Sequence, residues 1–260
     1  MNKNKTQVYF IGAGPGDLKL LTIKGLEIIQ KADVIIYADS LVNPGIRSLV
    51  RKDARIYGSS TLTLEEIKGL VVEAVNEGKL VARVHSGDPS VFGAVMEQMA
   101  MLDEAGVNYE VVPGVSSFSA AAASLKVEYT MPEVAQTIII TRREGRTPVP
   151  EPENLKALAS HGSSMAIFLS ASMIKEVVRE LLDGGYPSDT PAAVVRRASW
   201  PDEKICLAPL EKLPEEVEKA GIKDHALILV GKFLDREARR KASGSRLYSK
   251  DFSHGRRKAR

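Results

Sequence analysis

Short apolar runs alternate with amphipathic stretches along most of this chain, a pattern that predicts an α/β protein. In the first half, we expect strands at 8–11, 34–37, 80–84 and 109–112, and helices at 22–31, 64–76, 91–104 and 116–125. The helix expected at 64–76 is the clearest, since Leu64, Ile67, Val71 and Val75 recur at helical spacing.

The second half repeats the alternation with a different set of segments. We expect strands at 137–141, 165–169, 192–196 and 226–230, with helices around 172–182 and 213–220. Pro113-Gly114 interrupts the chain before the alanine-rich helix. The predicted organisation is an N-terminal α/β domain at 1–114, a C-terminal α/β domain at 115–235 and a basic tail at 236–260, each domain being a sheet flanked by helices.

Composition restricts the class of protein. The chain has 260 residues, 44% hydrophobic and 27% charged, which suits two ordinary globular domains. No apolar run approaches the 18 or so residues of a membrane span, and no signal core opens the sequence. Cys206 is the single cysteine, which excludes an internal disulfide, and the absence of a Cys and His cluster gives no metal site. We expect a cytoplasmic protein without a bound metal.

Charge is distributed unevenly between the body and the tail. Residues 236–260 carry ten Lys or Arg against two acids, net +8, whereas the whole chain is +3, which leaves −5 for residues 1–235. A duplex-binding domain would spread basic residues over a folded face, so we expect no nucleic-acid partner. The tail could still attract an anion, either nucleic acid or a polycarboxylate substrate, or could be a solvated extension.

A glycine-rich segment, Gly12-Ala13-Gly14-Pro15-Gly16-Asp17, directly follows the first expected strand. Glycines there permit a tight turn and close approach of a ligand to the backbone. Asp39, at the end of the second expected strand, would suit the ribose of a dinucleotide. However, the third glycine of that fingerprint is missing, and Pro15 lacks the N–H that a phosphate loop would use. The segment fits a ligand without phosphate, or a tight turn alone.

Two further turns follow expected strands. In His85–Gly93, Gly87-Asp88-Pro89 is typical of a turn, and we expect Asp88 to cap a helix that begins near Ser90. Pro113–Ser117 opens the alanine-rich helix, where Ser116 is either an N-cap or a ligand contact. We interpret His85 as a structural residue rather than a base and Cys206 as inert.

Taken together and in this order, these segments resemble the tetrapyrrole methylase family over residues 6–235. The similar segments are Gly12–Asp17, Leu21-Thr22, Gly25, Ala32–Val34, Tyr37–Val42, Gly87–Pro89 with Gly93, and Pro113–Ser117. Longer strings are similar to the members of the family that methylate carbon 11 of precorrin-4 or its cobalt form. These strings are His85–Gly93, Met96–Met99, Thr141–Glu151, Trp200–Lys204 and Lys250–Lys258.

The resemblance implies a two-domain protein, usually a homodimer, with S-adenosylmethionine in the cleft between its domains. Many cofactor contacts would be made by the backbone. The expected cofactor-binding residues are Pro15, Gly87, Asp88, Pro89, Val91, Ser116, Ser117, Leu169, Ala198 and Ala226. This cofactor has no phosphate, in agreement with the incomplete dinucleotide fingerprint.

The implied reaction is methylation of a tetrapyrrole carbon on the pathway to cobalamin. Much of the acceleration could come from holding the methyl group and the carbon in line. The acetate and propionate groups of the substrate require cations, for which the candidates are Arg142, Arg143 and Arg146 on the proline-rich 142–152 loop, together with the basic tail. Asp39 is the candidate catalytic residue, as a group that orients the substrate or accepts a proton, with turn capping as the alternative.

Other functions stay open at this point. A methyltransferase of the same fold could act on another precorrin, on ribosomal RNA or on a modified protein residue, and the basic tail favours the RNA. A non-catalytic dinucleotide-binding module is the remote alternative. The sequence also leaves open whether the tetrapyrrole contains cobalt.

Overall fold

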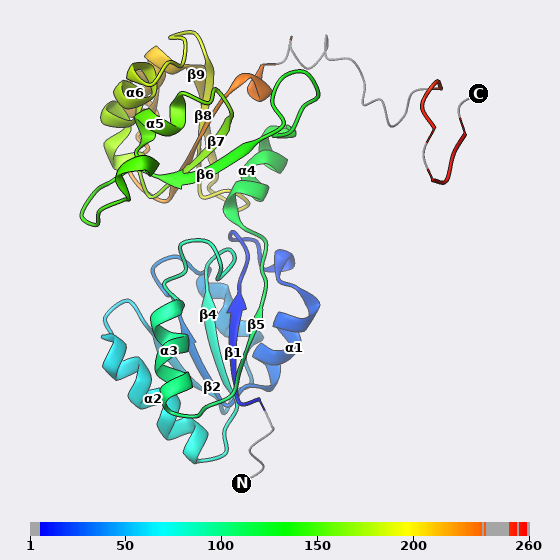
Figure 1. Cartoon of the computed structure of the whole chain (residues 1–260). Helices are drawn as coiled ribbons and strands as arrows, with labels where there is room; N and C mark the ends of the chain where they lie inside the picture. The colour runs from blue at the N-terminus through cyan, green and yellow to red at the C-terminus, as the bar shows by residue number, and fades with distance from the viewer. Residues whose placement is uncertain (1–5, 236, 238–249, 254, 259–260) are drawn as a thin grey trace. The chain divides into compact units, whose positions relative to one another are not determined.

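The computed structural model describes residues 6–235, 237, 250–253 and 255–258. The described chain divides into two compact units, each with one five-stranded sheet flanked by helices, so the predicted α/β class is confirmed (Figure 1). The first unit extends to Ala120 and also includes Ala198–Pro201, whereas the second contains Ala121–Arg197 and the chain from Asp202 onward. The predicted boundary at residue 114 stays a prediction.

The sheet of the first unit is parallel throughout, with the strand order β3-β2-β4-β1-β5. Its strands are β1 (Val8–Gly12), β2 (Val34–Tyr37), β3 (Arg55–Gly58), β4 (Val81–His85) and β5 (Tyr109–Val112). The helices are α1 (Ile23–Lys31), α2 (Leu64–Asn76) and α3 (Met96–Glu104), with 3-10 turns η1 (Leu18–Leu20) and η2 (Pro44–Leu49). Figure 1 shows α2 and α3 on one face of this sheet and α1 on the other. Parallel strands bring all five carboxyl ends to one edge.

Local sequence explains where the helices of the first unit begin. Thr22 caps α1, and Thr63 forms a capping box with Glu66 at the start of α2. The expected start of the third helix at residue 91 is wrong, because α3 begins at Met96. Phe92 and Ala94 have φ values of 53° and 47°, which are incompatible with a right-handed helix.

The sheet of the second unit is mixed, with the order β6-β7-β10-β8-β9. Its strands are β6 (Ile138–Arg142), β7 (Ser164–Phe168), β8 (Pro191–Arg196), β9 (Lys204–Pro209) and β10 (Ala226–Val230). Strands β6 and β7 are parallel, whereas β10 is antiparallel to β7 and β8, and β9 is antiparallel to β8. The strand expected at 165–169 lies one residue earlier, and β3 and the short helix α5 were not predicted.

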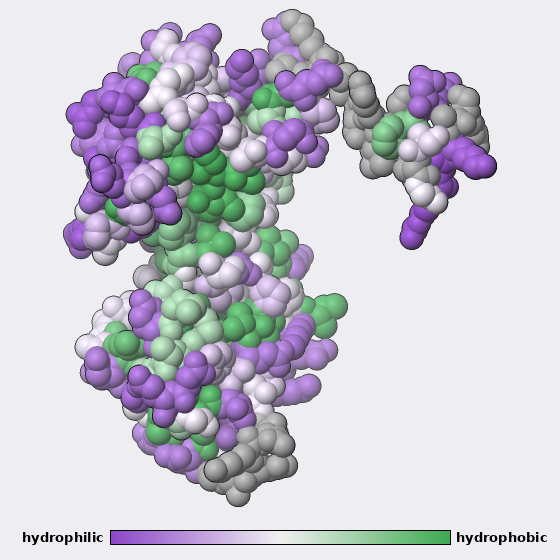
Figure 2. Space-filling model, viewed as in Figure 1, coloured by the Kyte–Doolittle hydropathy of each residue, from purple (hydrophilic) through white to green (hydrophobic). Residues whose placement is uncertain are grey.

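Helices of unequal length complete the second unit. They are the second half of α4 (Ser117–Leu125), whose residues up to Ala120 belong to the first unit, and α5 (Leu155–Ala159), α6 (Ile174–Asp183) and α7 (Leu213–Lys219). The turns are η3 (Glu151–Glu153), η4 (Ala171–Met173), η5 (Leu210–Lys212) and η6 (Lys232–Leu234). One core packs α5, α6 and α7 against the sheet. Figure 2 shows apolar surface over β6, where Ile140 is 36% exposed. In the described residues, no helix is both long and apolar enough to cross a membrane.

Candidate functional site

Three loops meet at the carboxyl edge of the first sheet. Gly14 and Gly87 form an isolated antiparallel bridge, with Gly14 N–H donating to the Gly87 carbonyl at 3.2 Å and Gly87 N–H donating to the Gly14 carbonyl at 2.8 Å. A Cβ on Gly12 would lie 2.6 Å from the Cα of Gly114, and a Cβ on Gly114 would overlap the Gly87 carbonyl. The loops after β1, β4 and β5 therefore touch through their backbones, and these contacts require glycine.

Asp88 ties the second loop to the third. Its carboxylate accepts from the backbone N–H of Gly114 and of Ser90, each at 2.8 Å, and from the Ser90 hydroxyl. Burial acts to raise the pKa of Asp88, but these hydrogen bonds outweigh it and hold the pKa below its ordinary value. The expectation that Asp88 caps a helix near Ser90 is wrong, since a turn follows and its carboxylate joins two loops instead.

The residues expected to bind the cofactor in the first unit lie at this edge. Pro15 is in the first loop, and Gly87, Asp88, Pro89 and Val91 are in the second. A Cβ on Gly87 would lie 3.7 Å from the Cα of Ser116, which is buried and precedes Ser117, the first residue of α4. The structure thus brings these residues together, and their role in binding stays a prediction.

Side chains of the protein form hydrogen bonds with the backbone of the first loop. The Pro15 carbonyl accepts from the indole N–H of Trp200 at 2.8 Å, and the Gly16 carbonyl accepts from the Asn43 amide at 2.9 Å. Asp17 N–H donates to the Ser199 hydroxyl at 3.0 Å. Sequence reasoning missed these contacts, although Trp200 opens one of the similar strings. The N–H groups of Ala13 and Gly14 also donate to backbone carbonyls, and Pro15 has none, so the loop has few donors left for a phosphate.

Asp39 lies on the turn after β2, at the same edge of the sheet. Its carboxylate accepts from the N–H and the hydroxyl of Ser60, each at 2.8 Å, and a Cβ on Gly58 would lie 2.6 Å from the carboxyl carbon. The hydrogen bond from the Ser60 side chain is the main cause of a lowered pKa of Asp39. Asp39 is therefore an exposed, ionised group anchored to the turn after β3, and its catalytic role stays a prediction.

A buried polar layer underlies this edge, on the face covered by α2 and α3. Arg83 donates through Nε to the Gln98 side chain at 2.8 Å, and burial lowers the pKa of Arg83 to about 10 despite the nearby Asp39 charge. His85 is 4% exposed, and its Nε2 has no hydrogen-bond partner within the described part of the chain. Burial, then the Arg83 charge, lower the pKa of His85 to about 3, with the Gly93 carbonyl opposing them. His85 is a neutral imidazole at physiological pH.

In the second unit, the register of the mixed sheet brings other predicted residues to one edge. Arg142 ends β6 opposite Phe168, the residue before Leu169, and Ala226 begins β10 opposite Arg196 at the end of β8. Leu169 is 64% exposed with a φ of 54°. The predicted Ala198 follows Arg196 by two residues and belongs to the first unit.

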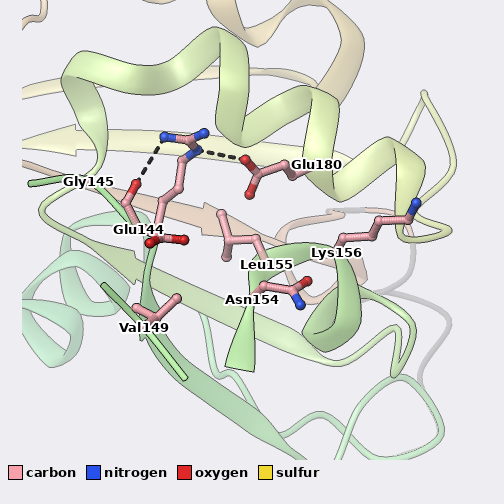
Figure 3. A pocket seen from close by; sticks show the side chains of 8 residues that line it. Glu144, Gly145, Val149, Asn154, Leu155, Lys156 and Glu180 are labelled. Atoms are coloured by element: carbon pink, nitrogen blue, oxygen red, sulfur yellow. Dashed lines mark hydrogen bonds and ion pairs between the residues drawn. The ribbon is translucent and has the colours of Figure 1, made fainter. Parts of the chain in front are cut away.

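The arginines of the 142–152 loop have different surroundings. Arg142 donates to the carbonyls of Thr147 at 3.1 Å and Pro148 at 2.7 Å, which closes the loop. Arg143 donates through Nε to Glu180 of α6 at 2.8 Å and lines a cavity of about 470 Å³, with Glu144, Gly145, Val149, Asn154, Leu155, Lys156 and Glu180 (Figure 3). Arg146, between these contacts, is exposed. Two of the three predicted arginines thus have structural partners.

The other predictions concern metal binding, the basic tail and Cys206. Among them, no three His, Cys, Asp or Glu side chains form a cluster that could hold a metal ion. Of the tail, Lys250 and Arg256–Lys258 are described, whereas the other basic residues lie outside the described residues. Cys206 is buried, and burial raises the pKa of its thiol.

Comparison with known proteins identifies the class. The model of the tetrapyrrole (corrin/porphyrin) methylases matches residues 7–214, so the chain belongs to this family. It is 54% identical over 256 residues to the cobalt-precorrin-4 C(11)-methyltransferase of Methanocaldococcus jannaschii, covering 98% of both chains. It is 47% identical over 252 residues to the Priestia megaterium enzyme of the same name, covering 97% of this chain and 98% of that one.

Solved structures that are similar to this chain are also tetrapyrrole methyltransferases. The X-ray structure of a cobalamin biosynthetic enzyme, cobalt precorrin-4 methyltransferase, superimposes with a TM-score of 0.86 at 47% identity, covering 88% of this chain and 95% of that one. The uroporphyrin-III C-methyltransferase of Thermus thermophilus, in complex with S-adenosylhomocysteine, gives a TM-score of 0.74 at 28% identity, covering 88% and 98%.

Proposed function

We propose that the protein transfers a methyl group from S-adenosylmethionine to carbon 11 of cobalt-precorrin-4 in cobalamin biosynthesis. The observation that carries this proposal is the 54% identity along 98% of both chains with a relative of that named activity. Relatives named for cobalt-precorrin-4 are 54% and 47% identical, whereas a Pseudomonas aeruginosa relative named for precorrin-4 is 43% identical. We therefore place the cobalt form before the metal-free one.

The carboxyl edge of the first sheet fits S-adenosylmethionine. Glycines at Gly12, Gly87 and Gly114 leave no Cβ atoms between the three loops, and Ser116 lies beside them. The first loop uses its polar backbone groups within the protein, which suits a ligand that has no phosphate. Pro15, Gly87–Pro89, Val91, Ser116 and Ser117 would hold the cofactor here. Leu169, Ala198 and Ala226 stay contacts that the family resemblance predicts.

When bound, the cofactor would supply an electrophilic methyl group for the tetrapyrrole carbon. The protein contributes orientation and exclusion of water. Asp39 is ionised, and with its lowered pKa it is better suited to orient the substrate by charge than to accept a proton. Arg146 would bind a substrate carboxylate, while Arg142 and Arg143 shape the loop that carries it.

Incubation of the purified protein with S-adenosylmethionine and either cobalt-precorrin-4 or precorrin-4 tests the proposal. We expect one methyl group at carbon 11, located by NMR, with a higher kcat/KM for the cobalt form. Methylation at another carbon would contradict the assigned position. Methylation of neither tetrapyrrole, in a protein that binds the cofactor, would contradict the substrate class.

We also propose that the protein is a cytoplasmic homodimer. The edge strand β9 exposes Ile205 (41%) and Leu207 (52%), and a second copy could cover this apolar edge. Light scattering after size-exclusion chromatography should give twice the chain mass. If wild-type protein and Leu207→Lys both elute as monomers, this proposal is wrong.

A further inference from the structure

The turn after β8 has an unusual backbone. Ala198–Pro201 belongs to the first unit, although β8 and β9 on either side belong to the second. Arg197 and Ser199 have φ values of 50° and 70°, in the left-handed region that residues other than glycine rarely adopt. A conformation of this kind persists where surrounding contacts hold it.

Arg197 N–H donates to the His225 carbonyl at 2.9 Å, whereas Ser199 and Trp200 contact the glycine-rich loop after β1. The Trp200 indole N–H donates to the Pro15 carbonyl at 2.8 Å, and the Ser199 hydroxyl accepts from Asp17 N–H at 3.0 Å. A Cβ on Gly16 would overlap the indole ring, so the ring lies directly against the backbone of Gly16. Trp200 and Ser199, here called the clasp, therefore bind three consecutive residues of the loop.

Asn43 completes the restraint on the loop. Its amide donates to the Gly16 carbonyl at 2.9 Å, while its side-chain oxygen accepts from Gly45 N–H at 2.9 Å. A segment with two glycines loses much conformational freedom on ordering, so without these side chains it would sample many conformations. The clasp and Asn43 select one of them.

We propose that Trp200 and Ser199 are positioning residues for methyl transfer: they hold Pro15–Asp17 in the conformation that receives S-adenosylmethionine. This inference rests on the proposed function, since it requires the loop to contact the cofactor. The clasp acts through the loop, because the Trp200 indole donates to the Pro15 carbonyl and the Ser199 hydroxyl accepts from Asp17 N–H.

Trp200 is the only tryptophan of the chain, so intrinsic tryptophan fluorescence reports on the clasp directly. In the protein without ligand, Gly16→Ala should displace the indole and shift its emission toward that of solvated tryptophan. Gly69→Ala is the matched control, because a Cβ at Gly69 meets nothing within 4 Å and the emission should not change. Unchanged emission in Gly16→Ala would overturn the clasp.

Calorimetry with S-adenosylhomocysteine measures the consequence for binding. Trp200→Ala and Gly16→Ala should each weaken its binding about tenfold or more, equivalent to about 1.4 kcal/mol. Trp200→Phe keeps an aromatic ring and loses the N–H, and should give a smaller loss. The KM for the cofactor should rise in each variant while the KM for the tetrapyrrole stays unchanged.

The controls separate this inference from the proposed function. If the wild-type protein does not bind S-adenosylhomocysteine, the proposed function fails. If the wild type binds it and both Trp200 variants, folded by circular dichroism, bind it equally well, the positioning role alone is overturned. Equal rises in the KM of both substrates would also contradict it, because they would indicate a general structural defect.

Discussion

The two sheets have five strands each, but they differ in the direction of those strands. In the first sheet all strands are parallel, so the loops after β1, β2, β4 and β5 leave from one edge. In the second, only β6, β7 and β8 end at the edge that carries Arg142, and β10 begins there. Apart from Ser117, which begins α4, the predicted site residues of the first unit are on loops, whereas Arg142 and Ala226 of the second are on strand ends.

This difference changes what each edge demands of its residues. Where the loops of the first edge converge, their backbones touch at Gly12, Gly87 and Gly114, and a side chain at these positions would collide with a neighbouring loop. At the second edge the contacts are made by side chains, such as Arg143 with Glu180. Ligand binding at the first edge should therefore be sensitive to glycine-to-alanine substitutions, which add a methyl group. Ligand binding at the second edge should be sensitive to substitutions that remove a charge.

The largest effect is expected from Gly114→Ala. The new Cβ would overlap the Gly87 carbonyl, and relieving this overlap should separate the loops and weaken S-adenosylhomocysteine binding about tenfold to a hundredfold. Gly145→Ala, after β6, is the matched control, because its Cβ would meet only the Met173 side chain at 3.4 Å. Calorimetry with S-adenosylhomocysteine on both variants measures this effect. Equal affinities of the two variants would show that the two edges do not differ in their tolerance of an added methyl group.

Acid should destabilise the first unit through His85. The pKa of His85 is about 3 in the folded state and near 6.5 in the unfolded state. Between these two values, His85 is protonated in the unfolded state and neutral in the folded state, so protonation favours unfolding. The contribution of His85 to the free energy of unfolding is therefore fully present above pH 6.5. It should decline by about 1.4 kcal/mol per pH unit between pH 6 and pH 4. Urea unfolding across this range measures it. His85→Asn should reduce the slope, and an unaltered slope would assign the acid sensitivity to other groups.

Loss of one charge at the second edge should affect the tetrapyrrole alone. Arg146→Ala removes an exposed arginine and should raise the KM for the tetrapyrrole roughly tenfold, the equivalent of one charge-assisted contact. Affinity for S-adenosylhomocysteine and the free energy of unfolding should hardly change. Arg143→Ala should instead lower stability, because it leaves Glu180 unpaired. A loss of cofactor affinity in Arg146→Ala would show that the loop has another role.

The smallest effect is expected at Asp39. Asp39→Asn removes the negative charge and should lower turnover about fivefold, equivalent to about 1 kcal/mol. Ser60→Ala is the comparison, since it removes one hydrogen bond from the carboxylate and keeps the charge. Steady-state kinetics with saturating cofactor measure both. Turnover at the wild-type level in Asp39→Asn would leave Asp39 as a turn anchor.

Regular elements were predictable because their signals are local. The periodicity of 64–76 gave α2, and the apolar run at 34–37 gave β2, both with the observed bounds. The start of α3 was not predictable, because Phe92 and Ala94 are ordinary residues for a helix. Their positive φ values accompany a turn in which Gly93 lies against Pro89.

The sequence by itself determined the α/β class, the three glycine turns and, through their resemblance, the family. These features depend on residue types at short spacing. Glycines in the sequence mark the positions where the backbones of two loops come into contact. Only the tertiary structure decided that Asp88 joins two loops, that Arg142 and Arg143 have partners within their own unit, and that Trp200 binds a loop 185 residues away in the chain. The reason is that the partners of these side chains depend on loop conformation, strand order and register, which leave no periodic pattern in the sequence.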